Sequence, residues 1–206
     1  MKTILIVFTK ETVAGEVKTR LGEKIGMHAS KWVYEQLLQH TAQVSKKSKL
    51  KTVVFHNKKT IKQHPYFPHA LKNQVQIGTN LGEKMEAAFL WAFDKGYQKV
   101  LLIGSDLWTL NENTLLKAEQ ALDNNDFVIG PSYDGGYYLL GKKKMNRKIF
   151  KDIPWSTPQV FKKTLLNISK KSIHYLEIAN DIDDLEDLKA NRSLYESYQK
   201  QFTKNC

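Results

Sequence analysis

Short apolar runs alternate along the chain with longer segments in which apolar residues recur at helical spacing. The short runs are rich in branched and aromatic side chains and end in Gly, Ser, Asn or a charged residue, which is typical of strands. Nearly continuous apolar runs suit strands that are buried on both faces, so we expect a mainly parallel sheet covered by helices. The runs predict strands at residues 3–8, 52–55, 100–103, 126–129 and 137–140.

Between these strands the apolar positions follow a helical period. Asn80, with Glu83 three residues later, resembles a capping box, and Pro158 suits the first turn of a later helix. The β-α-β-α-β-α-β order predicts a three-layer α/β/α sandwich of Rossmann-like type, formed as a single domain over residues 1–206. The helices are predicted at residues 27–44, 80–93, 112–122, 158–166 and 184–198.

Composition excludes several classes of protein. With 41% hydrophobic and 11% aromatic residues, the chain is too apolar for a disordered polycation. Its single cysteine, Cys206, excludes a disulfide framework and a cysteine-rich zinc site. No apolar run approaches the length of a membrane span, and Lys10 and Glu11 follow the short first run at once, so no signal peptide is expected. We therefore expect a cytoplasmic protein.

The net charge of +11 raises the question of nucleic-acid binding. Only three of the 32 basic residues are Arg, whose planar side chain suits base edges and bidentate phosphate contacts. A dispersed surplus of Lys is more typical of a solvated surface, so nucleic acid is not expected as the partner and RNA binding remains an alternative. A small anionic substrate such as a nucleotide fits the charge equally well.

In open α/β sheets, ligands bind beyond the carboxyl ends of the strands, so the residues that follow each strand are the candidates for chemistry. After the first strand, the loop at residues 9–21 carries Gly15 together with Lys10, Lys18 and Arg20. One glycine and three cations can cradle phosphate groups. The loop matches neither a Walker A motif nor G-x-G-x-x-G, and a solvated basic loop is the alternative interpretation.

Acidic residues follow the later strands. Asp106 follows the strand at residues 100–103, where a carboxylate can hold a divalent cation or simply belong to a turn. Asp134 begins an Asp-Gly-Gly turn that also suits a plain hairpin. The run of acids from Asp181 to Asp187 is a local anomaly in so basic a chain. It either complements a helix dipole or supplies a second ligand to a metal shared with Asp106.

Other candidate residues are given structural roles. His56, His64 and His69 match no zinc spacing and are expected to be surface or loop residues. Tyr137 and Tyr138 are expected to pack in the sheet. The G-x-S-x-G motif of a Ser nucleophile is missing from the sequence.

Six segments at strand ends follow one another in a characteristic order. They are Phe8-Thr9-Lys10 with Gly15-Glu16-Val17-Lys18-Thr19-Arg20-Leu21, then Leu81-Gly82-Glu83-Lys84-Met85, Gly104-Ser105-Asp106, Asp134-Gly135-Gly136-Tyr137-Tyr138-Leu139, Trp155-Ser156-Thr157 and Asp181-Ile182-Asp183. Together they resemble a bacterial family provisionally assigned as glycosyltransferases. That family has a GT-A-like, nucleotide-diphospho-sugar transferase fold, which sugar-phosphate nucleotidyltransferases share. The resemblance covers about residues 3–190.

The resemblance implies roles for individual residues. Asp106 would be the main ligand of Mg²⁺ or Mn²⁺ and Asp183 the second, while Lys18, Asp106 and Asp134 would serve catalysis. Nucleotide and phosphate binding would fall to Lys10, Gly15, Lys18, Arg20, Gln76, Gly78, Thr79 and Ser105. The acceptor side would be formed by Trp108, Gly135, Gly136, Trp155, Ser156 and Thr157.

The chain departs from the family pattern at two positions. Thr12 stands where the family usually has Pro soon after the first Lys, and Trp108 stands where it usually has Pro two residues after the metal Asp. Both positions lie in binding loops, so we expect Trp108 to reshape the acceptor side or to reduce activity.

The function that follows from the resemblance is a divalent-metal-dependent transferase with a nucleotide or nucleotide-sugar donor and an acceptor of unknown identity. Glycosyl transfer and nucleotidyl transfer both remain open. A glycosyltransferase is the first expectation and a nucleotidyltransferase is the alternative. The case for glycosyl transfer is lowered somewhat because only Asp106 follows its strand, where metal-dependent glycosyltransferases commonly carry an Asp-x-Asp pair. The alternative of another class is a non-catalytic nucleotide- or RNA-binding protein.

Overall fold

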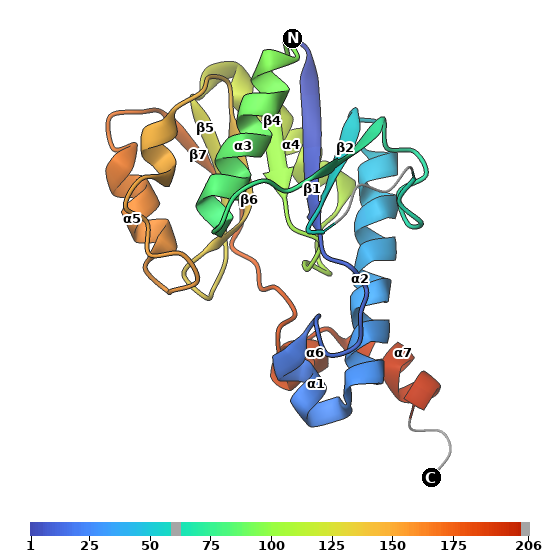
Figure 1. Ribbon diagram of the computed structural model, residues 1–206. Coiled ribbons are helices and arrows are strands. Elements are labelled where there is room, and N and C mark those ends of the chain that lie inside the picture. Colours follow the sequence, from blue (N-terminus) through green and yellow to red (C-terminus); the bar gives the residue numbers. More distant parts are fainter. Residues whose placement is uncertain (59–62, 203–206) are drawn as a thin grey trace.

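A seven-stranded sheet forms the centre of the computed structural model, which describes residues 1–58 and 63–202 (Figure 1). The strand order is β3-β2-β1-β4-β6-β5-β7. Strand β6 runs antiparallel to both neighbours, and the other neighbouring pairs are parallel. The predicted mainly parallel sheet is therefore confirmed. The strands are β1 (Thr3–Thr9), β2 (Thr52–His56), β3 (Lys72–Val75), β4 (Lys99–Ile103), β5 (Phe127–Pro131), β6 (Tyr137–Lys142) and β7 (Ile173–Tyr175).

The predicted strands are the apolar, buried ones. Every residue of β1, β2 and β4 is buried, as the continuous apolar runs indicate. The two strands that the sequence does not predict, β3 and β7, are short, partly exposed and partly polar, and they lie at the two edges of the sheet. An edge strand packs against fewer neighbours, so its apolar signal is weak.

Helices cover both faces of the sheet. On one face, α2 (Met27–Lys47) and α4 (Glu112–Asn124) form a core with Leu5 and Val7 of β1. On the other face, α3 (Leu81–Asp94), the 3₁₀ turn η1 (Arg147–Phe150) and α5 (Val160–Asn167) cover a second core, which includes Ile4 and Ile6 of β1 (Figure 1). Alternate residues of one strand thus face opposite cores, which gives the predicted three-layer α/β/α sandwich.

Three further helices gather next to the amino-terminal part of α2, beyond the point where β1 ends (Figure 1). They are α1 (Thr19–Ile25), α6 (Leu185–Ala190) and α7 (Arg192–Phe202). Helix α1 lies partly in the segment predicted to be a loop. The single helix predicted at residues 184–198 is wrong, because the chain breaks it at Asn191, which ends α6 and accepts the first backbone hydrogen bonds of α7. Cys206 lies outside the described residues.

Among the described residues, no helix combines the length and the apolar character that crossing a membrane requires.

Candidate functional site

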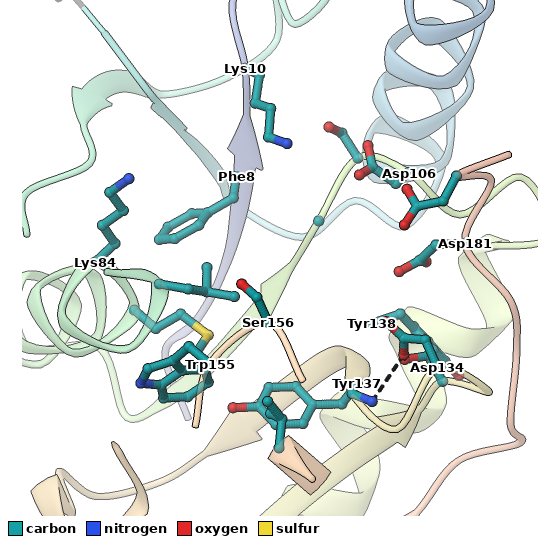
Figure 2. Close-up of a pocket in the computed structure, with 18 of the residues that line it drawn as sticks. Phe8, Lys10, Lys84, Asp106, Asp134, Tyr137, Tyr138, Trp155, Ser156 and Asp181 are labelled. Carbon is teal, nitrogen blue, oxygen red and sulfur yellow. Dashed lines mark hydrogen bonds between the residues drawn. The ribbon is translucent and has the colours of Figure 1, made fainter. Parts of the chain in front are cut away.

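A cavity of about 740 Å³ opens at the carboxyl ends of β1 and β4. Its lining comes from many separate stretches of the chain, from Phe8 to Asp183. Figure 2 shows acidic side chains, among them Asp106, Asp181 and Asp134, on one side of it, opposite Phe8, Lys84 and Trp155. The cavity therefore lies at the strand ends, where ligands of such sheets bind.

Lys18 forms the electrostatic centre of the acidic side. Its side chain is almost completely buried, and its Nζ lies 3.0 Å from Oδ2 of Asp106 and 3.0 Å from Oδ1 of Asp183. Burial alone would lower the pKa of Lys18, but the two carboxylates outweigh that effect and raise the pKa above its ordinary value. The ammonium group is thus a fixed cation held between two acids.

Asp183 is held from two directions. Arg20 Nη2 donates to its Oδ2 over 2.5 Å, and Lys18 and Arg20 together keep the pKa of Asp183 below its usual range despite the opposing effect of burial. Its own backbone N–H donates to Oδ2 of Asp187 over 3.0 Å. Asp187 also belongs to the capping box of α6 with Asp184, so the start of that helix fixes where Asp183 lies.

Asp181 begins the run of acids noted in the sequence, where it is given no role of its own, and it lines the cavity. Burial first, and the charge of Asp106 second, raise the pKa of Asp181 to about 7. Between Asp181 and Asp183, the backbone N–H of Ile182 donates to the carbonyl oxygen of Asp106 over 3.2 Å. The available signal was the alternation of acid, apolar residue and acid, which points both carboxylates to one side while Ile182 enters the core.

Asp134 lies in the turn of the β5–β6 hairpin, and this turn also borders the cavity. Its Oδ1 accepts hydrogen bonds from the Ser132 hydroxyl and, over 2.9 Å, from the backbone N–H of Gly136. The turn thereby presents a fixed carboxylate to the cavity.

Tyr34 is a site residue that sequence reasoning missed. Its hydroxyl lies 3.0 Å from Ser105 Oγ and accepts the backbone N–H of Lys10 over 2.8 Å. Tyr34 thus ties the end of β1 to the end of β4, and its burial raises its pKa. In the sequence, Tyr34 has the same helical spacing as the buried apolar residues of α2, so it cannot be distinguished from a core residue.

Most of the expected site residues border the cavity. Lys18 lies behind Asp106 and Asp183, in contact with both. The residues that line it directly are Lys10, Arg20, Gln76, Ser105, Asp106, Asp134, Gly136, Trp155, Ser156, Thr157 and Asp183.

Besides Lys18 and Trp108, four expected residues do not line the cavity and belong to the backbone turns around it. Gly15 adopts a φ of 82° in the loop after β1, with open space around it. Gly78 approaches Glu83, whose Oε2 accepts the backbone N–H and the hydroxyl of Thr79 over 2.7 Å, so both residues shape the start of α3. Gly135 packs against Pro158.

Trp108 requires a correction. It lies outside the cavity, where its ring packs 4.7 Å from His40 and its indole N–H donates to Ser193 Oγ over 3.0 Å. Its contacts are with α2 and α7, so Trp108 does not line the cavity in which we expected it to form the acceptor side.

The expectation of surface or loop histidines is wrong for His56, which lies in β2, whereas His64 and His69 lie in the loop that follows β2. His56 and His64 are buried with ring centroids 5.6 Å apart, and burial lowers the pKa of both, that of His64 to about 4. His69 is partly buried and bonds Ser45 Oγ.

Comparison with known proteins identifies the family of the chain and supports its fold. Residues 39–157, more than half of the chain, match the bacterial family described as "Uncharacterized protein conserved in bacteria (DUF2064)". No curated protein sequence matches the chain. A crystal structure from Desulfovibrio desulfuricans G20, provisionally assigned as a nucleotide-diphospho-sugar transferase, is 29% identical with a TM-score of 0.86. The match covers 98% of this chain and 91% of that one.

Two more distant structures share the fold. The 4-diphosphocytidyl-2C-methyl-D-erythritol synthase of Anaerococcus prevotii DSM 20548 is 13% identical, with a TM-score of 0.59 over 94% of this chain and 98% of that one. The manganese complex of Rv0371C from Mycobacterium tuberculosis H37Rv is 14% identical, with a TM-score of 0.57 over 96% of this chain and all of that one.

Proposed function

This chain belongs to the DUF2064 family of bacterial proteins, and we propose that it is a nucleotide-utilising transferase. The observation that carries the proposal is the meeting of the cationic loop after β1 with the acids Asp106 and Asp183 at one cavity. The similarity to the Desulfovibrio desulfuricans protein, assigned as a nucleotide-diphospho-sugar transferase, supports it over nearly the whole chain.

The donor phosphates would lie between the two groups of charge. Lys10 and Arg20 line the cavity with exposed side chains, and Lys18 lies behind them. Fixed cations of this kind stabilise charge that develops on a phosphate without having to reorganise. Holding both substrates in one cavity, in the orientation that the reaction needs, accelerates the reaction further.

The residues present fit a divalent cation. Asp106 and Asp183 each place an oxygen 3.0 Å from one point, now held by the Lys18 ammonium. Within the described residues, no group of three or more His, Cys, Asp and Glu side chains is arranged to hold a metal alone. Mg²⁺ is commonly bound by one or two carboxylates together with substrate phosphates, and such an ion would supply charge that stabilises the leaving group. We therefore propose Asp106 and Asp183 as ligands of Mg²⁺ or Mn²⁺.

Nucleotidyl transfer is the version we favour. The end of β4 supplies a single carboxylate, Asp106, and not the Asp-x-Asp pair that is common in metal-dependent glycosyltransferases. Its neighbour Ser105 is buried and forms a hydrogen bond with Tyr34. In this reaction a phosphate oxygen of the acceptor attacks the α-phosphorus of a nucleoside triphosphate, and pyrophosphate leaves with the bonding electron pair. In glycosyl transfer an acceptor hydroxyl would instead attack the anomeric carbon and a nucleoside diphosphate would leave.

Calorimetric titration tests the proposal. We expect at least one nucleotide of a panel of nucleoside triphosphates and nucleotide sugars to bind, and to bind more tightly with Mn²⁺. Asp106→Asn should weaken the metal-dependent affinity about tenfold or more. The control Asp94→Asn, at the exposed end of α3, should leave it unchanged.

Two outcomes count against the proposal. If no nucleotide binds with or without metal, the chain is not a nucleotide-utilising transferase. If Asp106→Asn keeps the full metal effect, Asp106 is not a ligand. Pyrophosphate release from a triphosphate donor, compared with nucleoside diphosphate release from a nucleotide sugar, distinguishes the two reactions.

A further inference from the structure

The cavity has a polar half and an apolar half. Asp106, Asp134 and Asp181 lie in the polar half (Figure 2), and Asp183 shares the Lys18 ammonium with Asp106. The opposite half continues the core beneath α3, because Phe8, Leu102 and Leu140 of the sheet and Met85 of α3 belong to that core and also line the cavity. The polar half accounts for phosphate and metal, which leaves the apolar half without an assigned ligand.

Trp155 forms the wall of the apolar half, and neighbouring residues hold it in place. A Cβ added to Gly82 would lie 2.4 Å from atoms of the Trp155 indole, so the ring rests on the first turn of α3 at the point where α3 has no side chain. Ser156, the next residue, adopts a φ of 64°, a strained conformation of the kind that often occurs at functional sites.

The other side of this segment is braced by the β5–β6 turn. Phe161 donates its backbone N–H to the carbonyl oxygen of Gly135 over 2.8 Å. A Cβ added to Gly135 would lie 2.2 Å from the carbonyl oxygen of Pro158, so the two segments are in direct contact. The wall at Trp155 is therefore fixed between α3 and the turn that carries Asp134.

We propose that the apolar half binds the body of the acceptor, and that the acceptor is the monophosphate ester of an apolar or aromatic alcohol. This inference rests on the proposed function, because the acceptor phosphate must reach the donor in the polar half. Lys84 lies on the apolar side and can meet the acceptor's negative charge as it enters (Figure 2).

The chemistry of the lining argues against a sugar or the donor base in this half. Hydroxyl groups and base edges each need a hydrogen-bond partner when they are buried. The apolar half is formed mainly by hydrocarbon and aromatic groups, of which Phe8, Leu81 and Met85 are examples.

Two amide side chains, Gln76 and Asn57, line the cavity near the ends of β2 and β3. Gln76 Nε2 donates to the carbonyl oxygens of Thr9 and Phe55. Asn57 Oδ1 accepts the backbone N–H of Glu11, so Gln76 Oε1 and Asn57 Nδ2 are the atoms that could meet a base.

Three probes test the inference by calorimetry: phenyl phosphate, glucose 1-phosphate and inorganic phosphate. We expect phenyl phosphate to bind about tenfold or more tightly than either of the others, with a negative heat-capacity change that reports burial of apolar surface. Equal or tighter binding of glucose 1-phosphate would overturn the inference.

A matched pair of variants locates the binding. Leu81 lines the cavity and is 45% exposed, so Leu81→Gln introduces an amide there without opening the core. It should weaken phenyl phosphate binding about fivefold or more. Leu166→Gln, on an exposed position of α5, should not change it. If Leu81→Gln leaves phenyl phosphate binding intact, the apolar half is not its site.

The same variants separate this inference from the proposed function. Loss of nucleotide affinity in Leu81→Gln, with phenyl phosphate unaffected, would place the donor base in the apolar half and overturn the inference alone. Absence of nucleotide binding in the unmodified protein would overturn the proposed function. The affinities for the three probes would still show whether the apolar half prefers an apolar phosphate ester to a sugar phosphate.

Discussion

Lys18 holds the position in which a metal ion would be expected. Its ammonium group lies 3.0 Å from carboxylate oxygens of both Asp106 and Asp183, and Lys18 is buried while the two carboxylates are partly exposed. Two cations cannot share that point, because like charges at contact distance repel strongly where water is excluded. The donor phosphates offer Lys18 another anionic partner, so metal and nucleotide binding should depend on each other.

Lys18→Met tests this competition. In the unmodified protein without nucleotide, Mn²⁺ should bind weakly, and removal of the ammonium should raise its affinity about tenfold or more. Electron paramagnetic resonance of free Mn²⁺ measures this directly, without any reaction.

The matched control is Lys10→Met, which removes an exposed cation of the same loop. It should raise Mn²⁺ affinity far less. Tight binding of Mn²⁺ to the unmodified protein, or equal effects of the two substitutions, would contradict competition at the Lys18 position. Circular dichroism checks that both variants are folded.

Lys142 is a buried lysine far from the cavity chemistry. Its Nζ lies 4.3 Å and 4.5 Å from the ring centroids of Phe89 and Phe150, and 3.6 Å from Met145 Sδ. Burial, only partly offset by the charge of Glu86, lowers the pKa of Lys142 from 10.5 to about 7. The aromatic rings attract the charged form but do not replace its hydration.

The lowered pKa of Lys142 makes stability depend on pH. Between about pH 7 and pH 10.5 the unfolded chain holds a proton on Lys142 that the folded protein has released. Its contribution to the free energy of unfolding should therefore rise with pH in that window, by at most about 1.4 kcal/mol per pH unit.

Urea denaturation of the unmodified protein and of Lys142→Met across this window measures the effect. The difference between them should change with pH, whereas Lys144→Met, on the exposed position two residues later, should follow the unmodified protein. Parallel pH profiles for the unmodified protein and Lys142→Met would show that Lys142 remains charged in the folded state.

At the scale of elements, the first turn of α3 and the Trp155 segment fit together through Gly82. Alanine favours helices over glycine by about 1 kcal/mol, yet in Gly82→Ala the new Cβ would overlap the indole. Overpacking of this kind costs about 1–3 kcal/mol unless the ring moves away. We expect the indole to be displaced and phenyl phosphate binding to weaken.

Fluorine NMR of protein labelled with fluorotryptophan measures the displacement. Of the resonances from four Trp residues, the one assigned by Trp155→Phe should shift in Gly82→Ala. Gly104→Ala, at a glycine with open space around it, should leave that resonance in place. An unchanged Trp155 signal in Gly82→Ala would contradict the role given to Gly82.

The elements also show which features a sequence reveals. Strands β1, β2 and β4 could be predicted because burial on both faces requires apolar residues at every position. The edge strands and the break at Asn191 could not, because short partly exposed elements and a backbone bend carry little apolar signal. The roles of Asp181 and Tyr34 were missed since they depend on which distant segments these residues meet.

At the scale of the whole molecule, the protein carries a surplus of positive charge, but its cavity is lined by a group of acidic side chains. Most of the 32 basic residues are dispersed over the chain, whereas the acids Asp106, Asp134, Asp181 and Asp183 converge on one cavity. These acids come from three separate stretches, and the cations that face them from a fourth. Only the folded chain brings the four stretches together, so a ligand of the cavity cannot bind the unfolded chain in the same way.

A ligand that binds only the folded state raises the melting temperature, and this distinguishes a nucleotide site from a general polyanion surface. At a nucleotide concentration of about 100 times Kd, stabilisation is about 2.7 kcal/mol, which corresponds to roughly 5–10 °C for a chain of this length. Thermal melts with Mg²⁺ and the nucleotide selected by calorimetry should show this shift and largely keep it when salt rises from about 50 to about 200 mM. A single-stranded RNA should give a smaller shift that disappears over the same salt range, because nonspecific phosphate contacts are lost as counterions compete. A large RNA shift with no nucleotide shift would instead assign the charge of +11 to RNA binding, against the transferase proposal.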